Sequence, residues 1–145
     1  MEINGYELGG IAFMTGEGPL WATRSHDGSE ALLALFSPAR GCELEERWRA
    51  WAGVEHPGVV RLLDVVRHED GRWALIEERA AGRPLDLLID TPALRSRSAR
   101  ERIVAELADA LLALHDAGIV HGDIAPANIV VSPEGRAVLV DILAP

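Results

Sequence analysis

The last third of the chain constrains the fold more than any other part. Residues 98–117 carry apolar side chains on most sides of a helical pattern and end at Gly118, which predicts a long helix that needs cover on more than one face. The run HGDIAPANIVV follows at residues 121–131 and ends in β-branched residues typical of a strand. A turn at residues 132–135 then leads to a second strand at 137–140. Any fold must accommodate a helix, a polar loop and a hairpin in this order.

The first half predicts an antiparallel sheet with one helix. Residues 43–52 place Leu44, Trp48 and Trp51 on one side, which indicates an amphipathic helix. The sequence therefore predicts an α+β chain with a sheet-rich part at 1–79 and a mainly helical part at 80–145. The strands expected in the first part cover residues 6–14, 19–24, 31–36, 58–66 and 73–77.

Composition excludes several classes of function. Cys42 is the only cysteine, so no intrachain disulfide can form. The formal charge of −9 disfavours nucleic-acid and anionic-membrane partners, and no apolar run is long enough to cross a bilayer, so we expect a cytoplasmic protein. All 14 basic residues are arginine, which leaves no lysine for phosphate binding or Schiff-base chemistry.

These elements resemble the protein kinase superfamily, in the fold of the eukaryotic-like serine/threonine protein kinases. The resemblance covers the whole chain, and the spacings from Asp123 to Asn128 and from Asn128 to Asp141 agree with the family pattern. It implies a kinase-like N-lobe, with a five-stranded antiparallel sheet plus the αC helix, and a truncated, mainly helical C-lobe that ends near the DFG-equivalent position. The matching segments are HGDIAPANIVV (the HRDxKPxN loop), residues 55–60 (the turn after αC), 78–82 (the hinge) and 140–143 (the strand into DFG).

The resemblance implies roles for four residues of the second part. Asp123 takes the place of the base that accepts a proton from the substrate hydroxyl, and His121 that of a scaffold residue. Asn128 and Asp141 take the places of the magnesium ligands, and their oxygen atoms suit a hard cation. Without the resemblance, the same residues also fit turn and cap positions, where Asp and Asn bond nearby backbone groups.

On the nucleotide side, the resemblance implies a degraded site. Gly16 and Gly18 take the place of the phosphate-covering loop, although their short segment is also an ordinary β-turn. Glu78 takes a place in the hinge. Ala34 stands where the family has its phosphate-binding lysine, a loss that we expect to cost about 3 to 4 kcal/mol of transition-state stabilisation.

Other departures weaken the kinase pattern further. Glu17 would repel phosphate, and Pro19 has no N–H to donate. Arg47 stands at the αC glutamate position; it either turns inward to neutralise Asp141 or replace the lysine, or it is a solvated arginine beside the apolar face. The remaining replacements in the loop and DFG segments are Gly122, Ala125, Ile142 and Leu143.

The sequence therefore predicts a truncated pseudokinase that acts as a protein-interaction or regulatory module, without efficient phosphotransfer and with no required cofactor. The alternative is a residual or partner-completed Ser/Thr protein kinase or nucleotide sensor that binds ATP and Mg weakly. A small-molecule kinase fragment is a third interpretation, based on HGD alone. For a chain that ends at Pro145, we expect another protein chain or a second copy to cover the apolar helix at residues 103–114, the αE region.

Overall fold

The computed structural model describes all residues, 1–145, and they divide into two compact units. The first unit holds Met1–Ala52 and Arg61–Arg79, and the second holds Gly53–Val60 and Ala80–Leu143, while Ala144 groups with the first and Pro145 with the second. Residues 53–60 therefore group with the second unit, although the sequence pattern places them with the sheet-rich part. No helix has the length and apolarity that crossing a membrane would require.

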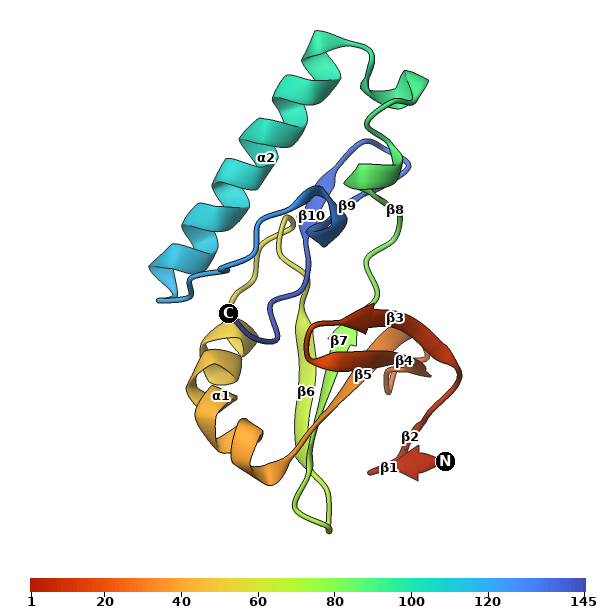
Figure 1. Cartoon of the computed structure of the whole chain (residues 1–145), viewed down its shortest axis with the longest axis vertical. Helices are drawn as coiled ribbons and strands as arrows, with labels where there is room; N and C mark the ends of the chain where they lie inside the picture. Colours follow the sequence, from red (N-terminus) through yellow and green to blue (C-terminus); the bar gives the residue numbers. More distant parts are fainter. The chain divides into compact units, whose positions relative to one another are not determined.

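The first unit is built on a five-stranded antiparallel sheet, as the sequence predicts (Figure 1). The central strand reads EALLALF, pairs with a strand on each side and is buried along most of its length, because both faces of the sheet are covered here. In sheet order the strands are β3 (Ile11–Thr15), β4 (Gly18–Arg24), β5 (Glu30–Phe36), β7 (Trp73–Glu78) and β6 (Leu62–Arg67).

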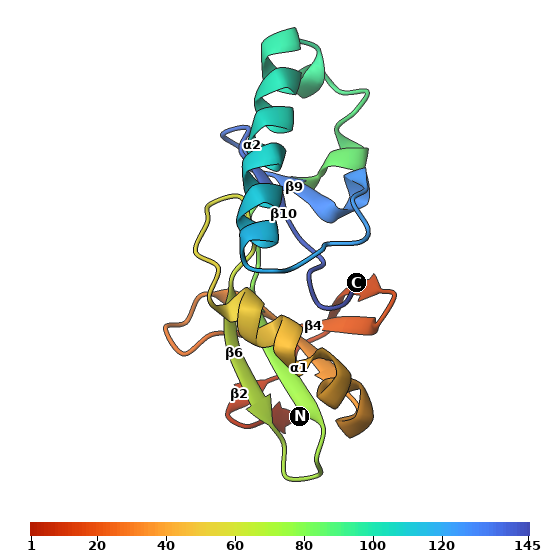
Figure 2. The ribbon, with the colours of Figure 1, turned by 90° about the vertical axis from the view of Figure 1, so that its left-hand side faces the viewer.

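Helix α1 (Pro38–Ala52) covers one face of this sheet (Figure 2). The helix begins earlier than the expected residue 43, because the Ser37 hydroxyl accepts a hydrogen bond from the Arg40 amide (3.2 Å) and Pro38 suits the first helical position. Its buried Trp48 ring lies 4.9 Å from the Phe36 ring and 5.8 Å from the Trp73 ring, measured between centroids. Aromatic packing thus joins the helix to β5 and β7.

A short N-terminal hairpin covers the other face. Strands β1 (Glu2–Ile3) and β2 (Tyr6–Glu7) pair around Asn4 and Gly5, whose φ angles of 50° and 89° are typical of a tight hairpin turn. The expectation of one strand over residues 6–14 is therefore wrong, because residues 6 and 7 pair with this hairpin and β3 begins only at Ile11. The side chains buried in this second core are Ile3, Tyr6, Ala31, Leu33, Ala74 and Ile76.

The second unit packs α2 (Arg97–Asp116) beside a small sheet of β10 (Ala137–Leu139), β9 (Ile129–Val131) and β8 (Arg83–Pro84). The Ser96 hydroxyl caps α2 by accepting from the Ala99 amide (3.1 Å), and Glu106 joins the helix to β10 by accepting from the Ala137 amide (2.7 Å). Strand β8 lies in a segment that the sequence indicates only as a connector. Three 3-10 turns complete the unit: η1 (Leu85–Leu87), η2 (Pro92–Leu94) and η3 (Pro126–Asn128).

Residues 53–60 contribute to the second unit through the backbone. The Leu139 amide donates to the Gly58 carbonyl (2.7 Å), and the Val60 amide donates to the Leu139 carbonyl (3.1 Å). The expected strand at 58–66 is therefore divided: its first residues bond to β10, and only Leu62–Arg67 forms β6 in the five-stranded sheet. The sequence hides this division, because apolar residues continue on both sides of Arg61 and no turn signal separates them.

Candidate functional site

His121 joins the HGDIAPANIVV loop to the strand that leads to Asp141. Its side chain is only 1% exposed; Nε2 donates to the Val140 carbonyl (2.8 Å), and Nδ1 accepts from the Asp123 amide (3.1 Å). These two bonds require an imidazole with its proton on Nε2, since Nδ1 must stay free to accept. His121 therefore links the loop to the strand through both of its ring nitrogens.

A second bond fixes the same strand to the loop. The Val140 amide donates to the Asn128 carbonyl (3.0 Å), so both backbone groups of Val140 bond to the loop. Asp141 follows with a φ of 62°, a left-handed conformation that few non-glycine residues adopt and that costs about 1 to 3 kcal/mol. Such strain persists where the surrounding structure holds the backbone, as the Val140 bonds do here.

Asn128 and Asp123 contact each other directly. The Asn128 Nδ2 donates to the Asp123 carbonyl (2.9 Å) and to its carboxylate Oδ2 (3.2 Å). The Asn128 side chain is placed by η3, whose first residue, Pro126, is preorganised for a helical turn. These bonds leave Asn128 Oδ1 available as an acceptor, and the Asp123 side chain remains exposed.

Two residues of this segment carry oxygen donors of the kind that suits a hard divalent cation. Asn128 Oδ1 and the Asp141 carboxylate are oxygen donors of the kind that Mg²⁺ prefers. The chain places no group of three His, Cys, Asp or Glu side chains where they could hold a metal ion by themselves. A cation bound by Asn128 and Asp141 would therefore need further oxygen ligands from solvent or from phosphate, which is the usual arrangement for Mg²⁺.

In the first unit, Gly16 and Gly18 lie at the turn between β3 and β4. The Thr15 hydroxyl donates to the Gly18 carbonyl (2.9 Å) and accepts from the Glu17 amide (3.1 Å), so the turn satisfies its own polar groups. Gly18 has a φ of 114°, which favours glycine. The turn is a closed hairpin in which the Glu17 amide is already used.

Arg40 reaches this turn from the first part of α1, a contact that the sequence pattern does not predict. Its Nη2 lies 2.6 Å from Glu17 Oε1, its Nε 3.2 Å from Glu17 Oε2, and its Nη1 2.8 Å from Glu43 Oε2. The hydrogen bond from Arg40 holds the pKa of Glu17 below its usual value. No local pattern indicates the pair, because 23 positions separate the two residues.

Ala34 and Glu78 lie on neighbouring strands. Ala34 is 4% exposed and is paired with Leu20 on β4 and Leu75 on β7. Glu78 ends β7; its amide donates to the Arg61 carbonyl (3.0 Å), and its Oε1 accepts from the Arg61 amide (2.9 Å). The Glu78 carboxylate therefore already accepts a hydrogen bond, through Oε1, from the backbone of the first unit.

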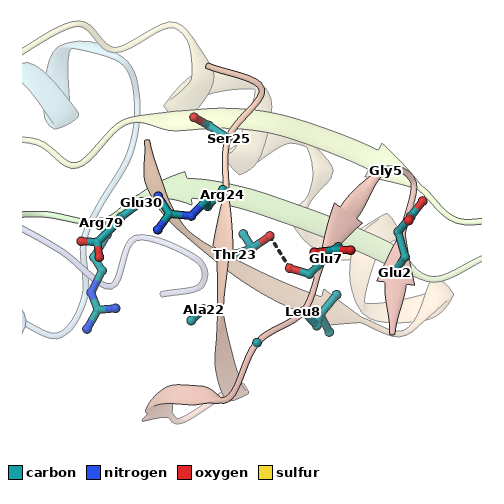
Figure 3. A pocket seen from close by; sticks show the side chains of 11 residues that line it. Glu2, Gly5, Glu7, Leu8, Ala22, Thr23, Arg24, Ser25, Glu30 and Arg79 are labelled. Carbon is teal, nitrogen blue, oxygen red and sulfur yellow. Dashed lines mark hydrogen bonds between the residues drawn. The ribbon is translucent and has the colours of Figure 1, made fainter. Parts of the chain in front are cut away.

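A cavity of about 600 Å³ in the first unit lies elsewhere (Figure 3). It is lined by the N-terminal hairpin, β4 and Arg79, and the Thr23 hydroxyl donates to the Glu7 carbonyl beside it (2.7 Å). None of the residues that the family resemblance assigns to a site lines this cavity.

The comparisons with known proteins agree on one family. The model of the protein kinase domain matches residues 44–142. The serine/threonine-protein kinase PkaB of Streptomyces coelicolor is 33% identical over 124 residues, 81% of this chain and 29% of that protein. Two Myxococcus xanthus relatives, the serine/threonine-protein kinases pkn2 and pkn3, are 36% identical over 89 residues and 32% identical over 85 residues.

The chain belongs to the protein kinase family. The matched region covers β6, β7, α2 and the whole HGDIAPANIVV loop, together with most of α1. The chain spans 29%, 10% and 16% of the lengths of PkaB, pkn2 and pkn3 respectively.

Proposed function

We propose that this member of the protein kinase family is a pseudokinase, a regulatory or protein-interaction module without efficient phosphotransfer. The absence of lysine from the whole chain carries this proposal. Ala34, at the family's lysine position, offers only a methyl group between two leucines. A transferring phosphoryl group would therefore lack a cation that the family positions on this strand.

The missing cation should lower the rate of phosphotransfer by a large factor. Removing one preorganised donor from a developing charge lowers the rate by about a hundredfold to a thousandfold, and a full positive charge should matter at least as much. The turn between β3 and β4 adds to the deficit, because the Glu17 amide already donates to the Thr15 hydroxyl and Pro19 lacks an N–H. Both effects disfavour binding of nucleotide phosphates.

A residual or partner-completed phosphotransferase, or a nucleotide sensor, is the second candidate. It is favoured by Asp123, Asn128 and Asp141, which keep residue types suited to proton transfer and Mg²⁺ binding. The bonds from His121 and Asn128 to Val140 also hold Asp141 beside the loop without any ligand. A purely structural module has no evident need to keep both Asn128 and Asp141, the two residues at the magnesium-ligand positions.

Calorimetric titration with ATP, with and without Mg²⁺, distinguishes the two candidates. For a pseudokinase that does not bind nucleotide, we expect no heat of binding at about millimolar ATP, the weak end of the affinity scale. Binding that requires Mg²⁺ and is lost in Asp141→Ala would support the nucleotide-binding alternative. Asp116→Ala, a change at the end of α2, is the matched control for loss of an acidic side chain.

Restoring the lysine tests the observation that carries the proposal. Ala34→Lys adds the missing cation, and Ala34→Met adds similar bulk without charge. If the lost cation limits nucleotide binding, the lysine variant alone should gain affinity for Mg-ATP. Equal behaviour of the two folded variants, checked by circular dichroism, would show that the defect lies elsewhere in the chain.

A further inference from the structure

The turn between β3 and β4 is attached to α1 by an ion pair with two hydrogen bonds. The Arg40 guanidinium donates from Nη2 to Glu17 Oε1 (2.6 Å) and from Nε to Glu17 Oε2 (3.2 Å). A bidentate arrangement fixes direction as well as distance, because the planar guanidinium matches the two carboxylate oxygens. Glu17 is therefore held in one orientation relative to the helix.

Both partners are prepared for this contact by their own elements. Arg40 Nη1 also bonds Glu43 Oε2 (2.8 Å) one helical turn away, which restricts the arginine side chain. Glu17 is presented by the closed hairpin in which the Thr15 hydroxyl bonds the Glu17 amide and the Gly18 carbonyl. Little further ordering is then needed when the carboxylate and the guanidinium meet.

The pair is also partly shielded from solvent. The Glu17 side chain is 27% exposed and that of Arg40 is 36% exposed, whereas the Arg97–Glu101 pair on α2 has exposures of 85% and 63%. Shielding reduces screening by salt, so the interaction should be stronger than a typical surface pair.

We propose that the Glu17–Arg40 pair is a latch that makes the β3–β4 turn and the first part of α1 move as one body without any bound ligand. In this arrangement the position of the turn is set by a carboxylate of the chain itself. Any partner or ligand that displaces α1 would move the turn with it. The latch lies within the first unit and does not depend on whether the chain is a pseudokinase.

Amide hydrogen exchange of residues 16–20, among which Pro19 has no amide hydrogen, tests the latch. In Glu17→Gln, which removes the charge and keeps the shape, we expect these amides to exchange about two to five times faster than in the unchanged chain. Glu101→Gln is the matched control, since it removes the acid of the exposed Arg97–Glu101 pair on α2 and leaves the Glu17–Arg40 pair and its neighbours unchanged. Equal exchange at residues 16–20 in both variants would overturn the proposal.

Charge-reversal variants test whether the attraction between Glu17 and Arg40, and not the local backbone structure, protects the turn from exchange. Glu17→Arg and Arg40→Glu should each raise the exchange rates, and the double variant should recover most of the lost protection, because it restores an opposite pair. Failure of the double variant to recover would contradict the latch. Slow exchange in the unchanged chain must also be present before Mg-ATP is added; protection that appears only with nucleotide would contradict it as well.

Discussion

Gly41 lies in the first part of α1, at a point where the indole of Trp73 occupies the space of a side chain. A Cβ at residue 41 would lie 1.9 Å from Trp73 Cδ1 and 2.1 Å from Trp73 Nε1. The buried Nε1 has no hydrogen-bond partner, which fits a ring placed by packing. Glycine is therefore required here by contact with a neighbouring strand.

We expect Gly41→Ala to destabilise the first unit by about 1 to 3 kcal/mol, because overpacking forces the ring or the helix to move. In an open helix the same change stabilises by about 1 kcal/mol. The sign of the change in stability therefore shows whether contact with Trp73 dominates at residue 41. Urea unfolding followed by tryptophan fluorescence measures it. A more stable variant would show that Trp73 moves aside at no cost.

His121 connects two backbone segments through its two ring nitrogens. We expect His121→Ala to lower the free energy of unfolding by about 2 kcal/mol, because it leaves the Val140 carbonyl and the Asp123 amide without their partner. His115→Ala, at an exposed position of α2, should change stability by less than about 0.5 kcal/mol. Similar losses in both variants, measured by chemical denaturation, would argue against the scaffold role.

Tyr6 is the only tyrosine in the chain, which makes its ionisation directly observable. Its hydroxyl donates to Asp64 Oδ2 (2.7 Å), and burial, followed by this bond and the Asp64 charge, raises its pKa. The stabilisation from a raised pKa is fully present below the ordinary tyrosine pKa of about 10 and is lost as the pH rises through the higher folded value.

We therefore expect tyrosinate absorbance to appear in the folded chain only well above the ordinary pKa, and the stability of the chain to fall across that alkaline range. Tyr6→Phe should lower stability at neutral pH by about 1 kcal/mol and flatten the alkaline loss. Ionisation of folded Tyr6 at its ordinary pKa, seen by absorbance, would contradict the buried hydrogen bond.

At the scale of elements, local signals predict the existence of helices and strands better than their ends. The amphipathic pattern of Leu44, Trp48 and Trp51 correctly indicates α1, because it depends only on helical spacing. The beginning of α1 depends on the Ser37 cap, and the hairpin at Asn4 and Gly5 on positive φ angles. The cap and the hairpin turn each involve only one or two residues. A strand or helix predicted from the neighbouring apolar residues is therefore easily placed a few residues too long or too short.

The latch predicts a pH dependence for this part of the fold. Because Arg40 lowers the folded-state pKa of Glu17, its stabilisation is present above the ordinary glutamate pKa and is lost as the pH falls through the lower folded value. We expect Glu17→Gln to cost less than about 1 kcal/mol at neutral pH, and this difference to disappear in acid. Thermal unfolding of both proteins across the acidic range checks this, and a pH-independent difference would contradict it.

For the whole molecule, α2 presents apolar side chains to solvent. Val104 is 67% exposed and Leu112 is 59% exposed, two helical turns apart on one side. We propose that this αE region binds another protein chain or a second copy. We expect light scattering to give a mass above that of one chain, and the double change Val104→Gln and Leu112→Gln to lower it. A single-chain mass for the unchanged protein would contradict self-association.

The sequence by itself determined the family and the kinds of element, because periodicity and motif spacing are properties of neighbouring residues. The order of the loop residues Asp123 and Asn128, the apolar strand at residues 31–36 and the absence of lysine all follow from the printed chain. Only the tertiary structure decided that residues 58–60 bond to β10 and that Arg40 holds Glu17. These contacts join positions far apart in the sequence, so they depend on how helices and strands pack and have no local signal.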